Sequence, residues 1–155
     1  MTDVQTLDRA YHFILTTFVA RGDPPHYTEL AAAFGLAPEG GKALLHELLG
    51  TGIPCWAYPD TDYIASFAPF NAQPTQYRLF VDGEPRGYAQ CGFEALAACW
   101  LFPGRVVTVR APGLDGGAAA WVELRDGKLL RSSDPVLVAY VDLHFADWPK
   151  NRAYA

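Results

Sequence analysis

The sequence has little charge, few cysteines and no long apolar run. Asp, Glu, Lys and Arg together make up 19% of its 155 residues, below the share of about a quarter that is usual for globular domains. Half of the residues are apolar, and a chain of this length can bury a sizeable core, so intrinsic disorder is not expected. We therefore predict a globular protein with one core or two small lobes.

The missing features also bear on location. No stretch approaches the roughly 18 consecutive apolar residues of a membrane-spanning helix. Asp3 and Asp8 occur where a secretory signal carries basic residues, so no signal peptide is predicted. The cysteines are odd in number and lack the spacing of a disulfide framework. They are Cys55, Cys91 and Cys99, and we interpret them as free thiols. The prediction is a cytoplasmic protein without a membrane partner.

The first part of the chain is predicted to be helical. Apolar residues recur at three- and four-residue steps from Val4 to Val19, as in an amphipathic helix. A short helix is expected over residues 29–34, capped by Thr28, and another from residue 38 to Gly50. This spacing is typical of a helix-turn-helix.

A short β ribbon is expected after these helices, because residues 62–68 alternate with period two. Residues 1–70 are therefore interpreted as an N-terminal, winged-helix-like lobe. Residues 69–75 contain Pro, Asn and Gln and are predicted to be a connector.

Residues 76–155 are predicted to form a second domain, so that the whole chain belongs to the α+β class. A strand over residues 77–81 is followed by one central helix over residues 90–102. The later strands give a mixed, mainly antiparallel β domain, and they are expected at residues 105–111, 120–125, 128–132 and 136–143.

The charge distribution argues against nucleic acid as a partner. Residues 1–75 contain eight acidic and three basic residues, and the rest of the chain is neutral. The expected recognition helix has Lys42 and His46 against Glu39 and Glu47, whereas DNA-binding modules gain most of their affinity from Lys and Arg on phosphates. A transcriptional regulator is thus the third-ranked hypothesis.

The chemistry of the chain is predicted to centre on Cys91 and Glu94. Cys91 lies at the expected start of the central helix, where backbone N–H groups and the helix dipole favour a thiolate. Glu94 follows one turn later on the same face. The alternative is that Cys91 is a small apolar core residue and that Glu94 only complements the helix dipole.

Five segments of the second domain resemble the organomercurial (alkylmercury) lyase family. They are Leu79-Phe-Val-Asp-Gly83, Tyr88-Ala-Gln-Cys91, Gly92-Phe-Glu94, Ala95-Leu96 and Phe102-Pro-Gly-Arg105. That family is similar in having a helical, winged-helix-like lobe before a mixed β domain. The resemblance thus covers most of the chain.

The resemblance implies protonolysis of a carbon–mercury bond, with an organomercurial or another thiol-reactive small molecule as the partner and no organic cofactor. Cys91 would be the thiolate that captures mercury, and Glu94 the acid that protonates carbon. This division of roles agrees with the preference of soft metals for thiolate and with the need for a nearby acid.

Two positions differ from the family pattern. The family has aspartate where this chain has Glu94, and it has a second cysteine after the strands that correspond to residues 136–143. Here no cysteine follows Cys99, and eight residues of helix would place Cys99 roughly 12 Å from Cys91. Cys55 is the remaining candidate for a second mercury ligand. The alternative function is a non-catalytic soft-metal or small-molecule binding protein on the same fold, and the sequence predicts no oligomeric state.

Overall fold

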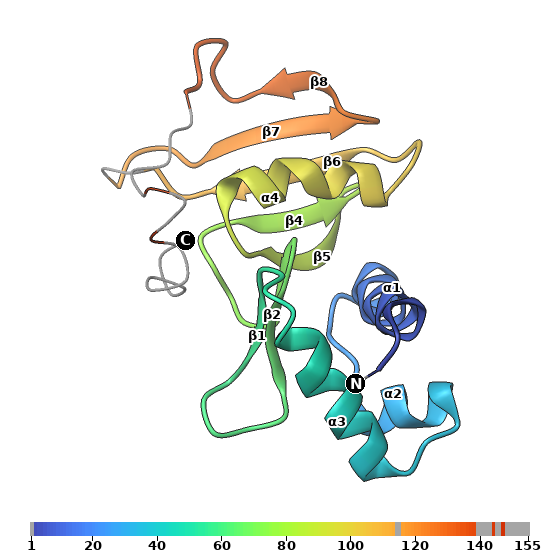
Figure 1. The fold of residues 1–155 in the computed structure, drawn as a ribbon. Coiled ribbons are helices and arrows are strands. Elements are labelled where there is room, and N and C mark those ends of the chain that lie inside the picture. The colour runs from blue at the N-terminus through green and yellow to red at the C-terminus, as the bar shows by residue number, and fades with distance from the viewer. Residues whose placement is uncertain (1, 114–115, 139–143, 145–146, 148–155) are drawn as a thin grey trace.

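The computed structural model describes residues 2–113, 116–138, 144 and 147 (Figure 1). Within these residues, three N-terminal helices precede the strands, and a fourth helix lies between the fifth and sixth strands. Every strand pairing among them is antiparallel. The predicted α+β class, with N-terminal helices and one helix inside the β region, is confirmed.

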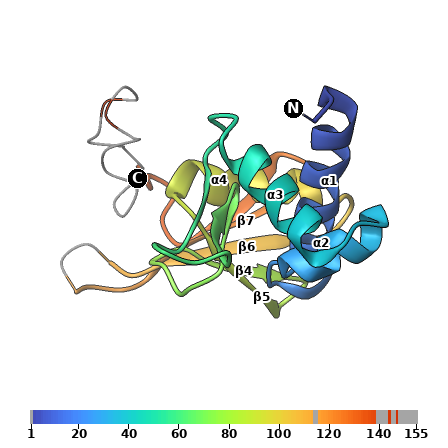
Figure 2. The ribbon, with the colours of Figure 1, turned by 60° about the horizontal axis from the view of Figure 1, so that its bottom comes forward.

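The first three helices are α1 (Val4–Arg21), α2 (Tyr27–Phe34) and α3 (Pro38–Leu49). They lie together at one side of the molecule (Figure 2). Asp3 caps α1 by accepting a hydrogen bond from the N–H of Thr6. The cap of α2 is His26, in a capping box with Glu29, so the expectation that Thr28 caps this helix is wrong. Among the described residues, no helix is long and apolar enough to cross a membrane.

The strands form a single sheet with the order β1-β2-β3-β5-β4-β6-β7-β8. They are β1 (Cys55–Ala57), β2 (Ile64–Phe67), β3 (Phe70–Asn71), β4 (Arg78–Val81), β5 (Glu84–Ala89), β6 (Val107–Ala111), β7 (Ala120–Arg125) and β8 (Lys128–Ser132). The sheet thus contains strands from both predicted domains, 1–70 and 76–155. The division into these domains stays a prediction.

Two strands were not expected from the sequence. β5 contains Pro85 and Gly87, which are both depleted in strands, and β3 has only two residues within the predicted connector. Both strands are defined by their pairing with neighbours in the sheet. β3 pairs with β2 and β5, and β5 also pairs with β4. Of the strand expected at residues 136–143, residues 136–138 are not in a strand, and residues 139–143 lie outside the described part.

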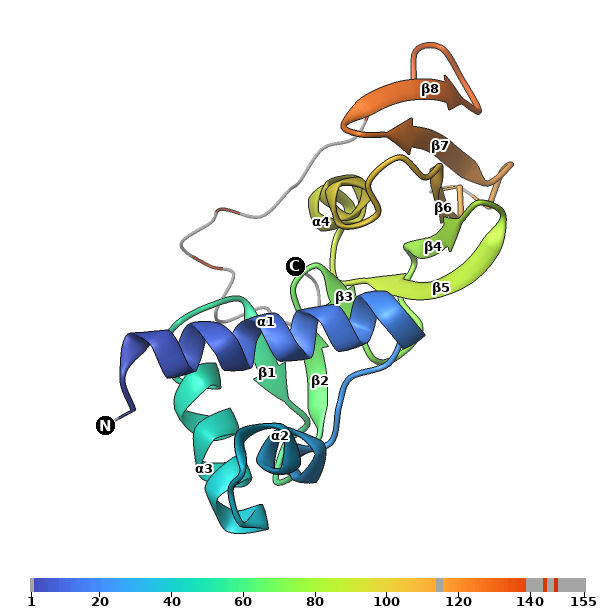
Figure 3. The same cartoon turned by 90° about the vertical axis from the view of Figure 1, so that its right-hand side faces the viewer.

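The fourth helix, α4 (Gly92–Ala97), continues as the 3-10 turn η1 (Ala98–Leu101). It lies across one face of the sheet, in front of β4 and β6 in Figure 1. On the N-terminal side, α1 crosses β1 and β2 in the view of Figure 3. Phe18 of α1 stacks on Phe70 at 5.3 Å between ring centroids, and Tyr11 contacts Phe67 at 5.1 Å. These contacts join the helices to the sheet in one core.

Candidate functional site

Cys91 occupies the two-residue connection between β5 and α4. It is the N-cap of α4, with an extended backbone, and 8% of its surface is exposed. The next residue, Gly92, lies against Tyr77, because a Cβ on Gly92 would be 3.2 Å from Tyr77 Oη. The missing side chain of Gly92 therefore lets the start of α4 lie close to Tyr77.

Burial raises the pKa of the Cys91 thiol above its ordinary value, and this is the largest effect on that group. The N–H groups of Glu94 and Phe93 lower the pKa, although the sulfur makes no capping hydrogen bond of normal geometry. The prediction that the helix start makes Cys91 an unusually acidic thiol is therefore wrong. The thiol is buried, and α4 is short, so the cost of desolvating a thiolate exceeds the benefit of the nearby N–H groups.

Glu94 is a partly buried acid beside this thiol. Burial raises the pKa of Glu94, and the neighbouring Cys91 thiol lowers it by a smaller amount. Glu94 Oε2 is inaccessible to solvent and has no hydrogen-bond partner of normal geometry. The carboxyl thus lies on the protein side of α4 next to the sulfur, in surroundings that favour its protonated form.

Cys55 and Tyr11 lie close enough to Glu94 for its charge to affect them. Burial raises the pKa of Cys55 to about 12, and the charge of Glu94 also contributes to this rise. Burial raises the pKa of Tyr11 as well, with smaller contributions from Cys55 and Glu94. The structure therefore places Cys55 of β1 and Tyr11 of α1 within electrostatic range of Glu94. No sequence pattern singled out Tyr11, which resembled any other residue of the apolar stripe.

Cys99 lies in η1 with 1% of its surface exposed and belongs to the core. Within the described part of the chain, no group of three or more His, Cys, Asp or Glu residues is arranged to hold a metal ion. Cys55, Cys91 and Glu94 therefore do not form a three-ligand metal site in this structure.

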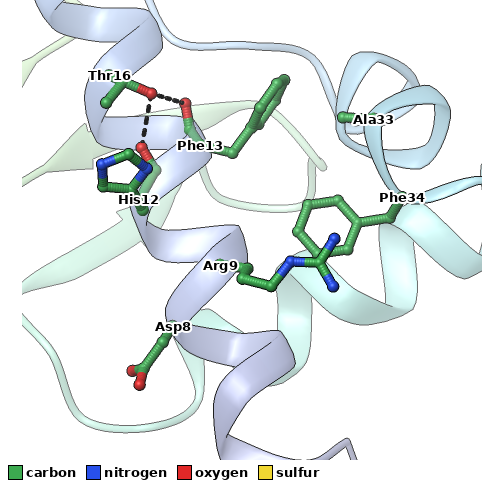
Figure 4. Close-up of a pocket in the computed structure, with 7 residues that line it drawn as sticks. All are labelled: Asp8, Arg9, His12, Phe13, Thr16, Ala33 and Phe34. Atoms are coloured by element: carbon green, nitrogen blue, oxygen red, sulfur yellow. Dashed lines mark hydrogen bonds between the residues drawn. The ribbon is translucent and has the colours of Figure 1, made fainter.

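Two hollows on the surface are lined by other residues. One, of about 440 Å³, lies between α1 and α2, where Arg9 covers the ring of Phe34 and Thr16 bonds to the carbonyls of His12 and Phe13 (Figure 4). The other, of about 400 Å³, includes His26, among other residues. Neither hollow is lined by Cys91 or Glu94.

The basic residues of α3 are engaged within the protein. Lys42 Nζ and His46 Nε2 each lie 2.7 Å from the carboxylate of Asp62. The helix expected to read DNA therefore directs the side chains of Lys42 and His46 to a carboxylate, which competes with any phosphate.

Comparison with known proteins relates the chain to others through its fold. No family model matches the chain, and no curated protein sequence does. Its α+β fold is similar to that of MerB2, as seen in the crystal structure of the mercury-bound form of that protein. The TM-score is 0.63 at 15% sequence identity, and the match covers 84% of this chain and 61% of that one. This likeness establishes a shared fold.

Proposed function

We propose that this protein is an organomercurial-lyase-like enzyme that cleaves a carbon–mercury bond with Cys91 and Glu94. The observation that carries the proposal is the contact between a thiol and a carboxyl whose buried surroundings raise its pKa. The fold likeness to mercury-bound MerB2 agrees with the family resemblance of the segments around Cys91. Since the chain spans 61% of the length of that protein, its activity is proposed from its own residues.

The first step is capture of the organomercury cation by Cys91. A mercury–sulfur bond forms, and the thiol loses its proton, which the neighbouring carboxylate of Glu94 accepts. Mercury is a soft cation, and thiolate sulfur is the soft donor among protein side chains. Because burial raises the pKa of Cys91, binding of mercury is the event that deprotonates this thiol.

The second step is transfer of a proton from Glu94 to carbon. The carbon–mercury bond breaks, its electron pair takes the proton, and the hydrocarbon leaves while mercury stays on sulfur. In the sum of both steps, the thiol proton has moved to carbon and mercury has replaced it on sulfur. The position of Glu94 on the first turn of α4 gives it access to a carbon atom attached to a mercury held by Cys91.

The test is incubation of the reduced protein with phenylmercury and an excess of a small thiol, followed by measurement of benzene. We expect benzene from the unaltered protein, none from Cys91→Ser, and a loss of about a hundredfold or more in rate for Glu94→Gln. Cys99→Ser is the matched control, because it removes another buried cysteine of the same domain. Absence of benzene from the unaltered protein contradicts the proposal.

A binding protein without turnover is the second candidate, and the burial of Cys91 favours it. With 8% of the surface of Cys91 exposed, the surrounding side chains hinder the approach of mercury that carries a bulky substituent. Phenylmercury that binds one-to-one through Cys91 without release of benzene would select this function. The same incubation, analysed by mass spectrometry of the intact protein, separates the two candidates.

A further inference from the structure

The face of the sheet away from α4, which we call the open face, carries two adjacent arginines. Leu79 of β4 and Val109 of β6 are paired and buried in the core that also contains Ala95 of α4. Figure 3 shows α4 on that side of β4 and β6. Successive side chains of a strand point to opposite faces. The next pair, Arg78 and Arg110, is therefore on the open face, where both residues are exposed.

The ring of Phe80 holds both guanidinium groups. Their Cζ atoms lie 5.0 Å (Arg78) and 4.8 Å (Arg110) from its centroid, in cation–π contact. Because Arg78 and Arg110 are directly opposed in neighbouring strands, their Cβ atoms are expected to be about 4.5–5.5 Å apart. Phe80 is two residues further along β4, so both arginines approach the ring from the same end. The two cationic groups can therefore contact one small ligand.

The charges of these two arginines have no counter-charge in the described part of the chain. None of the ion pairs between described residues includes Arg78 or Arg110. Glu123 lies on the same face, two residues from Trp121, the partner of Arg110. Its carboxylate is held by Arg131, at 2.8 Å from Nε and 2.7 Å from Nη2. Since like charges directly opposite each other destabilise a sheet, an anion bound to this pair would remove an unfavourable interaction.

Aromatic residues lie on both sides of the arginine pair. Tyr88 of β5 pairs with Arg78, and Trp121 of β7 pairs with Arg110. Directly opposed residues share a face, so one row across four strands reads Tyr88, Arg78, Arg110 and Trp121. Both aromatic residues are half-buried. The row thus offers apolar surface next to the two guanidinium groups.

We propose that Arg78 and Arg110 form a binding site for a doubly charged phosphate, either free or as the phosphate group of a small monoester. A guanidinium group donates two parallel hydrogen bonds to phosphate oxygens. A phosphate monoester carries about two negative charges near neutral pH, which matches the pair. Each phosphate of duplex DNA carries a single charge and matches it less well. The site is on the opposite face from α4, and it goes beyond the proposed cleavage of a carbon–mercury bond.

The test is a titration of the whole chain, near neutral pH and at constant ionic strength, with inorganic phosphate and with phenyl phosphate. NMR signals of the arginine Nε–H groups report where each probe binds, and we expect those of Arg78 and Arg110 to shift. Arg78→Gln and Arg110→Gln are each expected to weaken binding about tenfold or more, through the loss of charge-assisted hydrogen bonds. Arg9→Gln is the matched control, because Arg9 of α1 makes the same kind of contact, at 5.0 Å from the ring centroid of Phe34.

The two probes also distinguish the two forms of the ligand. Tighter binding of phenyl phosphate indicates a monoester whose organic group contacts the aromatic residues of the row, whereas equal affinities indicate free phosphate. Absence of binding by both probes overturns the proposal, and so does an equal loss of affinity in Arg9→Gln and in the variants of Arg78 and Arg110. Neither probe contains mercury, so a failure of this site is distinguishable from a failure of the proposed lyase activity.

Discussion

Arg86 Nη1 donates a hydrogen bond of 3.0 Å to the carbonyl of Ala20, across 66 positions of sequence. Ala20 is in the last turn of α1, and Arg86 is in β5, the strand that leads to Cys91. At the same place, Gly87 and Gly22 approach each other so closely that a Cβ on Gly87 would lie 3.2 Å from the carbonyl oxygen of Gly22. This contact fixes the end of α1 on the strand that positions the candidate site.

The close approach predicts that Gly87→Ala is strongly destabilising. Gly87 has φ +111°, which disfavours any side chain, and the added Cβ also meets the backbone of Gly22. We expect a loss of about 1–3 kcal/mol in the free energy of unfolding, measured by urea denaturation. Gly83→Ala is the matched control, because Gly83 also has positive φ, but a Cβ there meets no atom within 4 Å. Equal losses in the two variants would show that the contact with Gly22 is unimportant.

The raised pKa of Glu94 predicts that the stability of the protein depends on pH. Since burial raises the pKa of Glu94 above the ordinary value of 4.5, the folded state binds this proton more tightly than the unfolded chain does. The resulting stability is fully present below about pH 4.5 and is lost as the pH rises through the folded-state pKa.

In the Glu94→Gln variant the side chain at position 94 is neutral at every pH. The variant therefore does not lose stability through ionisation of this side chain. We expect the free energy of unfolding of the variant, relative to that of the unaltered protein, to increase as the pH rises above 4.5 and then to level off. Urea denaturation at a series of pH values measures this difference. A difference that is constant across the series contradicts a pKa of Glu94 raised by burial.

The three cysteines are expected to react with a neutral disulfide reagent in a fixed order. Cys91 has 8% of its surface exposed, Cys55 has 3% and Cys99 has 1%. Cys91 should therefore be modified first, at a rate that increases with pH beyond the range of an ordinary thiol, because burial raises its pKa. Mass spectrometry of the labelled peptides identifies the residue. Initial labelling of Cys99 would contradict the described burial.

DNA binding is expected to be absent. Lys42 and His46 of α3 are paired with Asp62, and residues 1–75 carry the whole net charge of −5. Titration with duplex DNA at low salt should show no association that weakens as salt is raised. Asp62→Asn removes the carboxylate that pairs with Lys42 and His46 and serves as the comparison. A salt-sensitive complex of the unaltered protein would restore the regulator hypothesis.

Local sequence patterns were sufficient to predict the helices and strands that have a strong apolar periodicity or a clear turn signal. The hairpin of β7 and β8 was predicted at its observed bounds, because Asp126-Gly127 is a strong turn signal. The same patterns did not reveal β5, since Pro85 and Gly87 lower its strand propensity, and its pairing with β3 and β4 forms only in the folded sheet.

The candidate site was predictable only in part, for a similar reason. Cys91 and Glu94 are three residues apart on one helix start, so their contact follows from local geometry. Cys55 pairs with Phe67 in the sheet, and Tyr11 packs on Phe67 from α1, so only the folded structure brings both within electrostatic range of Glu94. The acidity of the thiol was predicted with the wrong sign, because burial is a tertiary property that no helix-start pattern contains.

The burial of Cys91 also has a consequence for the residence time of mercury on its sulfur under the proposed function. Small thiols in solution remove mercury by attacking it directly, and a covering of packed side chains slows that exchange in both directions. The opening rate of the protein around Cys91, rather than the strength of the sulfur–mercury bonds, would then set how long the ion stays. A local unfolding step would thus control both loading and release.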